Sequence, residues 1–183
     1  MIYVALLRGI NVGGKNKVDM RLLKQVFEQA GMTDVVTYIN SGNIIFSSDM
    51  QSKAELAGML EKAIEAGFGL NIKVVVRNIG DFQGMMQSLP DSWTNDDNMK
   101  SDALFLWEDV DDAAVLDGLT IKPEIDRVLY VPGAILWSVD RDKAAKSGLL
   151  KLIGTDLYRK MTIRNVNTTR KIYELMLEAD KRS

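Results

Sequence analysis

A glycine-rich loop near the N-terminus has the residue spacing most suggestive of chemistry. The segment Gly9–Asn16 reads G-x-x-x-x-G-K-N, which differs from a phosphate-binding loop only in its last residue. In such loops, successive backbone N–H groups point at phosphate oxygens and the lysine adds positive charge. Asn16 stands where Ser or Thr would hold Mg²⁺, which argues against ATP hydrolysis. Two interpretations stay open: a connection without a ligand, or anion capture by Arg8, Lys15 and the amides of Gly13 and Gly14.

A second polar segment, Asn40–Asn43, lies between two predicted strands. Asn and Gly tolerate positive φ, so a tight hairpin turn accounts for all four residues. A functional interpretation also exists, because Asn40, Ser41 and Asn43 supply a hydroxyl and two amides. These groups would lie beside the glycine-rich loop if the first and third strands of the chain are neighbours.

A third candidate, Arg164–Thr168, precedes the C-terminal helix. Asn165, Asn167 and Thr168 are residue types that cap helices, with Asn167 or Thr168 expected as the N-cap. The alternative is an anion site at the N-terminus of that helix, to which Arg164 would add charge.

Composition excludes much of the usual catalytic chemistry. The 183 residues include no Cys and no His, so disulfides, thiol catalysis, Ser-His-Asp triads and nearly all zinc catalysis are excluded. A Ser41 nucleophile, acid–base chemistry by Asp or Glu, or electrostatic catalysis by Lys and Arg remain, without paired carboxylates to support them. Enzymatic activity is therefore left open, no catalytic residue or cofactor is identified, and no metal site is predicted.

Charge is distributed unevenly along the chain. The net charge is only -2, but residues 1–24 hold five Lys or Arg and one acid, and residues 143–171 hold eight and one. Residues 78–142 hold fourteen acids and four bases. The two basic segments would attract anions if the fold brought them together. The sequence pI of about 5.3 disfavours a general nucleic-acid binder.

The first half of the chain has the pattern of a ferredoxin-like α/β plait. Strands are predicted at Ile2–Leu7, Val35–Ile39, Ile44–Ser47 and Ile72–Arg77. One helix is predicted from an N-cap at Asp19 to Gly31, and another from the capping box of Ser52 and Glu55. The order strand, helix, strand, strand, helix, strand predicts one antiparallel sheet with both helices on one face.

The second half gives a similar pattern, so the fold class is predicted to be α+β with two tandem plaits. Strands are predicted at Ala103–Trp107, Arg127–Val131, Ala134–Val139 and Met161–Arg164, and helices at Phe82–Leu89, Asp111–Leu119, Asp142–Ile153 and beyond Thr168. The predicted domains are a first plait at 1–80, a connecting segment at 81–100, and a second plait with a C-terminal helix at 101–183. No apolar run approaches the roughly 20 residues of a membrane helix, and no signal peptide is predicted.

Three motifs together carry a resemblance to a known family. They are Ala5–Gly14, Tyr38–Phe46 and Thr162–Thr168. With them, the chain resembles the bacterial domain-of-unknown-function family numbered 1697 from its N-terminus to about Leu175. It departs from the family at Val166, where tryptophan is frequent. The resemblance implies two ferredoxin-like plaits and a cytoplasmic bacterial protein, and it implies no reaction, substrate or cofactor.

These observations favour a binding module for a small anionic ligand. A phosphate- or carboxylate-bearing molecule, such as a nucleotide or phosphometabolite, would be held in a cleft where the loop, the turn and the 164–168 segment converge. Asn11 would add directional hydrogen bonds to those of the other Asn and Ser side chains. The alternatives are an RNA-binding module that uses a sheet face, which is not favoured because the usual aromatic RNA signature is absent, and an enzyme of unknown reaction. No membrane partner is expected.

Overall fold

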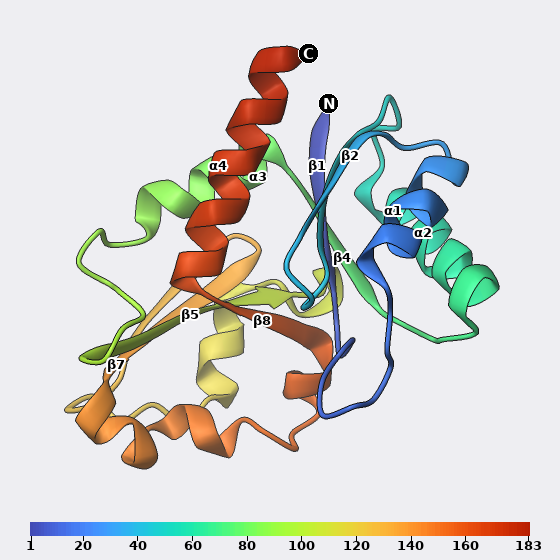
Figure 1. The fold of residues 1–183 in the computed structure, drawn as a ribbon. Coiled ribbons are helices and arrows are strands. Elements are labelled where there is room, and N and C mark those ends of the chain that lie inside the picture. The colour runs from blue at the N-terminus through green and yellow to red at the C-terminus, as the bar shows by residue number, and fades with distance from the viewer. The chain divides into compact units, whose positions relative to one another are not determined.

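The apolar run near the N-terminus forms one of the two inner strands of a four-stranded antiparallel sheet (Figure 1). All six residues of this strand are buried, which explains why it reads as a continuous apolar run and not as an alternating one. The sheet order is β2-β3-β1-β4. The strands are β1 (Ile2–Leu7), β2 (Thr33–Tyr38), β3 (Asn43–Ser47) and β4 (Val74–Asn78).

Helices α1 (Met20–Gln29) and α2 (Lys53–Phe68) pack on one face of this sheet. The predicted caps are confirmed, since the Asp19 carboxylate accepts from the first amides of α1 and Ser52 Oγ accepts from Glu55 N–H at 3.2 Å. The element order predicted for the first half is present. The core below the helices includes Tyr3, Ala5, Leu7, Leu23, Phe27, Phe46, Leu56, Leu60 and Ile64.

A second four-stranded antiparallel sheet, of order β6-β7-β5-β8, repeats the same arrangement. Its strands are β5 (Met99–Leu106), β6 (Arg127–Val131), β7 (Ala134–Asp140) and β8 (Met161–Asn165). Its core is built around Leu104, Leu106, Ile135 and Trp137. The protein is therefore a mixed α+β structure with two antiparallel sheets.

The prediction of α-helices at Asp111–Leu119 and Asp142–Ile153 is wrong, because both segments contain short 3₁₀ turns instead. The first segment holds η2 (Ala113–Gly118), and the second holds η3 (Arg141–Lys146) and η4 (Gly148–Lys151). Two further turns, η1 (Glu108–Val110) and η5 (Leu157–Lys160), lie outside the two segments. In the longer segment the backbone is extended at Ser147, which ends η3 and caps η4. The extended residue therefore prevents a continuous helix over this segment, although the spacing of its apolar residues fits one.

The buried carboxylate of Asp126 accounts for that interruption. It accepts hydrogen bonds from Ser147 Oγ at 2.6 Å, Gly148 N–H at 3.0 Å and Trp137 Nε1 at 3.2 Å. Burial by itself raises the pKa of Asp126, but these bonds and one from the amide of Lys122 outweigh it, so the pKa is lowered from 3.8. The carboxylate therefore binds the η3–η4 junction to β7 in its ionised form.

The chain divides into two compact units, and two further helices contain the residues at which one unit ends and the other begins along the sequence. The structure is a computed structural model that describes residues 1–183; the first unit is Met1–Phe82 with Ile172–Ser183, and the second is Gln83–Lys171. Helix α3 (Ile79–Ser88) and helix α4 (Val166–Arg182) each cross from one unit to the other along the chain. Most of the segment predicted as a connection therefore groups with the second unit, and the end of α4 groups with the first. No helix is both long and apolar enough to cross a membrane.

Gly42 gives a stability test of the turn between β2 and β3. It has φ of +88°, and an added Cβ would lie 2.8 Å from both Leu7 Cβ and Ile10 Cδ1. We expect Gly42→Ala to lower the free energy of unfolding by about 1–3 kcal/mol, measured by urea denaturation. The control is Gly58→Ala inside α2, where an added Cβ meets nothing within 4 Å. This variant should gain about 0.5–1 kcal/mol, and equal effects of the two substitutions would contradict the analysis.

The Asp126 network gives a pH-dependence test. A carboxylate whose pKa is lower in the folded state stabilises the protein above its unfolded pKa, and this stabilisation is lost as the pH falls through the folded pKa. We expect Asp126→Asn to cost about 1–3 kcal/mol near neutral pH. The difference from the parent should begin to narrow below about pH 4, where the carboxyl group of the unfolded chain takes up a proton, and it should close as the pH falls through the lower pKa of the folded state. Urea unfolding across this pH range measures it, and a difference independent of pH would show that the charge is not what stabilises the junction.

Candidate functional site

The strand pairing of the first unit brings the glycine-rich loop beside the turn at Asn40. Strand β1 pairs antiparallel with β3, with Leu6 opposite Asn43, so β1 ends where β3 begins. The bond from Leu7 N–H to Gly42 O, at 2.9 Å, extends this pairing to the turn itself. The two polar segments therefore leave the sheet at the same end, as expected if the first and third strands are neighbours.

The loop itself is a small hairpin. Asn11 N–H donates to Asn16 O at 3.1 Å, and Lys15 N–H donates to Val12 O at 2.9 Å. Between them Gly13 and Gly14 both have positive φ, of 57° and 76°, which is the conformation of a two-residue type I′ turn. The chain thus reverses direction at the position where the helix that follows a phosphate-binding loop would begin. α1 begins only at Met20.

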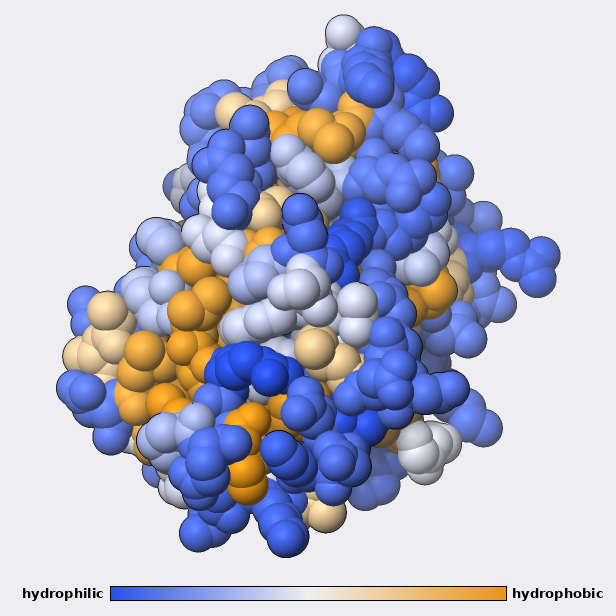
Figure 2. All heavy atoms as spheres, turned by 90° about the vertical axis from the view of Figure 1, so that its left-hand side faces the viewer, coloured by the Kyte–Doolittle hydropathy of each residue, from blue (hydrophilic) through white to orange (hydrophobic).

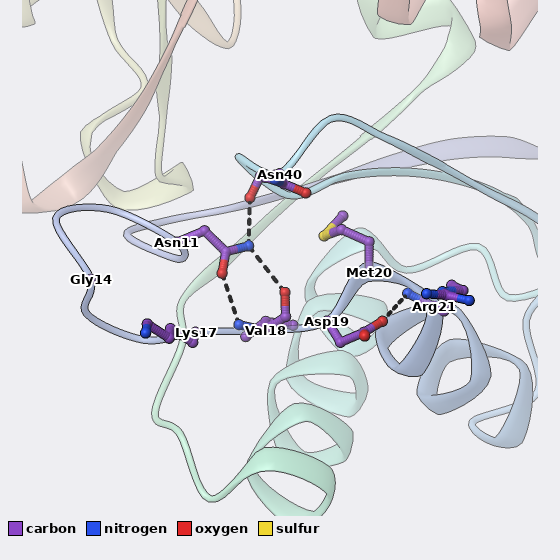
Figure 3. A pocket seen from close by; sticks show the side chains of 8 residues that line it. All are labelled: Asn11, Gly14, Lys17, Val18, Asp19, Met20, Arg21 and Asn40. Atoms are coloured by element: carbon purple, nitrogen blue, oxygen red, sulfur yellow. Dashed lines mark hydrogen bonds between the residues drawn. The ribbon is translucent and has the colours of Figure 1, made fainter.

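The side chain of Asn11 fixes the hairpin against its neighbours (Figure 3). Its Nδ2 donates to Val18 O at 3.1 Å and to Asn40 O at 2.8 Å, while its Oδ1 accepts from Val18 N–H at 2.8 Å. Both amide hydrogens are therefore used within the protein. Asn11 was predicted to contact a ligand, and in the structure it positions the residues around it.

A hollow of about 600 Å³ lies against this hairpin. Its lining residues are Asn11, Gly14, Lys17, Val18, Asp19, Met20, Arg21 and Asn40. In Figure 3, Lys17 and Arg21 lie on either side of the Val18–Asp19 segment. Both are exposed and neither forms an ion pair, whereas Asp19 Oδ1 accepts from the amides of Arg21 and Leu22 at 2.8 and 3.3 Å. The side chains of Lys17 and Arg21 carry two positive charges against the one negative charge of Asp19, so the lining of the hollow has a net positive charge.

The cations singled out in the sequence lie elsewhere on the first unit. Arg8 directly follows β1, and its N–H donates to Lys73 O at 3.0 Å. Lys15 is exposed on the returning arm of the hairpin. Neither lines the hollow. Lys17 and Arg21 were not singled out, although the excess of basic residues in 1–24 was the signal that could have found them.

The turn is held together by the side chain of Asn43. This residue is fully buried, and its Nδ2 donates to Tyr38 O at 2.9 Å and to Ser41 Oγ at 3.0 Å. The preceding Ile39 has φ of 50°, a strained conformation for a β-branched residue. Asn43 and Ser41 thus shape the turn, while Asn40 contributes to the hollow.

The remaining predicted site residues belong to the second unit. Arg164 is 7% exposed; its guanidinium donates to Thr162 Oγ1 at 2.8 Å and to Ile163 O at 3.0 Å, and burial lowers its pKa to about 10. Asn165, and not Asn167 or Thr168, caps α4, since its Oδ1 accepts from Thr168 N–H at 2.9 Å. Asn167 Nδ2 donates to Asn95 O at 2.8 Å. The 164–168 segment is thus engaged within its own unit.

No group of three or more Asp or Glu side chains is arranged to hold a metal ion, and the chain has no His or Cys.

Comparison with known proteins places the chain in a family. The family described as protein of unknown function (DUF1697) matches residues 1–137, and the chain belongs to that family. The solved structure of the conserved bacterial protein SP0830 from Streptococcus pneumoniae is similar to it, with 35% sequence identity and a TM-score of 0.82. The similarity covers 96% of this chain and 98% of the other. A search of curated proteins gave no match.

The role of Asn11 can be tested against that of Asn16, which is in the same hairpin and also has positive φ. Asn11→Ala removes three hydrogen bonds, whereas Asn16→Ala removes one, from Asn16 Nδ2 to Gly9 O at 2.9 Å. We expect a loss of about 1–3 kcal/mol for Asn11→Ala and about 0.5–1.5 kcal/mol for Asn16→Ala in urea unfolding. Hydrogen exchange at Val18 N–H should accelerate in Asn11→Ala alone. If the two substitutions lower the free energy of unfolding equally and change exchange at Val18 N–H equally, Asn11 does not position the hairpin as we infer.

Proposed function

We propose that this protein binds a small anionic molecule in the hollow lined by Lys17 and Arg21. The observation that carries the proposal is the pair of exposed cations, neither in an ion pair, around one concave surface. The hairpin behind it is held by the three hydrogen bonds of Asn11, so the site is formed before a ligand arrives. Preorganisation of this kind reduces the ordering that binding would otherwise require.

The chemistry of the lining favours phosphate or carboxylate groups. Hydrogen bonds to charged groups contribute about 1.5–3 kcal/mol each, so a few of them suffice for micromolar affinity, which corresponds to about 8 kcal/mol. Val18 and Met20 add apolar surface beside the cations. A nucleotide or a phosphometabolite combines both kinds of surface, and we propose this class of ligand.

We further propose that both units are ferredoxin-like plaits and that the protein is cytoplasmic and bacterial. The corresponding strand orders β2-β3-β1-β4 and β6-β7-β5-β8 support the assignment of the fold. The first unit also has the two helices of a plait, whereas 3₁₀ turns replace them in the second. The similarity to a bacterial protein supports the source.

The alternative of RNA binding by a sheet face has less support. Tyr3 and Phe46 lie in the core of the first unit and Trp137 in the core of the second, so these aromatics are not available to stack bases. The alternative of an enzyme rests on Ser41, whose hydroxyl accepts a hydrogen bond from the Asn43 amide. An amide that donates in this way supplies no base for a nucleophile.

Binding can be tested by isothermal titration with pyrophosphate, ADP and citrate at low salt. We expect Lys17→Ala and Arg21→Ala each to weaken the binding of at least one of these anions tenfold or more, since each loses a charge-assisted contact. Added salt should weaken binding in the parent. The matched control is Lys62→Ala, an exposed lysine on α2 that does not line the hollow.

The control should retain the parent affinity. If no anion binds the parent, or if Lys62→Ala weakens binding as much as the other two substitutions, the proposal is wrong. Binding of a single-stranded RNA oligonucleotide that is unaffected by Lys17→Ala and Arg21→Ala would favour the RNA alternative instead.

A further inference from the structure

The second unit contains a hollow of about 400 Å³ that is lined mainly by apolar side chains. Its apolar lining consists of Val139, Ala144, Ala145, Leu149, Leu150, Leu152, Ile153, Tyr158 and Ile163. Figure 2 shows the side of the molecule on which β7 lies in Figure 1, where apolar residues gather in patches among hydrophilic ones. The volume falls within the roughly 300–1,000 Å³ of small-molecule sites.

The 3₁₀ turns that follow β7 supply much of the lining of this hollow. Val139 and Ile163 form part of its floor on the sheet, while η3, η4 and the residues that follow form its walls. Asp126 fixes the η3–η4 junction through Ser147 and Gly148. The walls are therefore held in place by a buried network, and the hollow is a built feature of the second unit.

Two large apolar side chains remain exposed at this hollow. Leu150 is 52% exposed and Ile153 is 61% exposed, and both belong to its lining. Leaving aliphatic surface in contact with water is unfavourable, and an apolar ligand would cover part of it.

Ser147 and three charged residues complete the lining, and the charged residues give it a net positive charge. Lys100 and Asp102 form an ion pair on β5, with Asp102 only 6% exposed. Arg141 is exposed and forms no ion pair, but its Nε donates to Asp96 O at 2.9 Å and its Nη2 to Asn95 Oδ1 at 3.0 Å. These bonds hold the guanidinium in place beside the aliphatic lining.

We propose that this hollow binds an aliphatic monocarboxylate of medium chain length. The hydrocarbon chain would lie among Leu149, Leu152 and Ile163, and the carboxylate would meet Arg141. One anionic group matches the single positive charge in excess, and the predominantly apolar lining suits an unsubstituted hydrocarbon chain. The site lies in a different unit from the proposed anion site and is independent of it.

The test is a titration of the whole protein with hexanoate, heptanoate and octanoate, at concentrations below micelle formation. We expect saturable binding that tightens about fourfold for each added CH₂, because each group removed from water contributes about 0.8 kcal/mol. Ala145→Phe should abolish it by filling the hollow from its exposed side. Circular dichroism and urea unfolding show whether that variant is folded.

Arg141→Gln tests the place of the carboxylate, because it removes the positive charge and keeps a polar side chain at this position of the lining. It should weaken octanoate binding tenfold or more and leave binding of 1-octanol unchanged, since the alcohol has no charge to lose. Lys151→Gln is the matched control, because Lys151 is exposed nearby and does not line the hollow. It should behave as the parent does.

Three results would overturn the proposal: no saturable binding, an affinity independent of chain length, or equal loss in Arg141→Gln and Lys151→Gln. Binding to phosphatidylglycerol vesicles with no saturable binding of octanoate would instead identify the same apolar surface as a membrane contact. Failure of this test leaves the anion site of the first unit unaffected, because the two are probed by different ligands and different variants.

Discussion

The antiparallel pairing of β1 with β3 is the constraint on which the candidate anion site depends. It requires β1 to end where β3 begins, and the bond from Leu7 N–H to Gly42 O continues this pairing to the turn. On the other side of β1, the bond from Arg8 N–H to Lys73 O extends the pairing with β4. The chain can leave the sheet only after these bonds, so the loop emerges beside the turn. Asn11 then joins the two segments with a single side chain. The site is thus a consequence of strand register, completed by one amide.

Much of the fold could be predicted because its local signals agree with its tertiary structure. The apolar run of β1 and the caps at Asp19 and Ser52 are each decided within a few residues of sequence. The segment 142–153 is different, because its apolar spacing fits a helix while a distant carboxylate captures Ser147 and Gly148. A tertiary interaction of this kind leaves no local pattern. The strands of the second sheet can therefore be predicted from local sequence, whereas the 3₁₀ turns between β7 and β8 cannot.

The predicted site residues also show that local sequence does not reveal tertiary contacts, here those of single side chains. Residue types and spacing pointed to Asn11, Asn43 and Asn165, which the structure uses to hold a hairpin, a turn and a helix end. Amides that suit a ligand suit backbone groups equally well, so residue type alone cannot separate the two uses. Lys17 and Arg21 line the hollow only because the hairpin places them there. Their charge could be seen in the sequence, but their shared surface could not.

Helix α4 gives the chain an unusual order of completion. Its residues from Ile172 onward group with the first unit, with Ile172 and Met176 fully buried, so the second unit is inserted within the sequence of the first. A chain emerging from the ribosome supplies its N-terminal part first, and domains generally fold as units. Here the inserted unit has all its residues earlier, whereas the first unit has all of its residues only after the last turns of α4 have been synthesised. The part of the protein made first is therefore the part finished last.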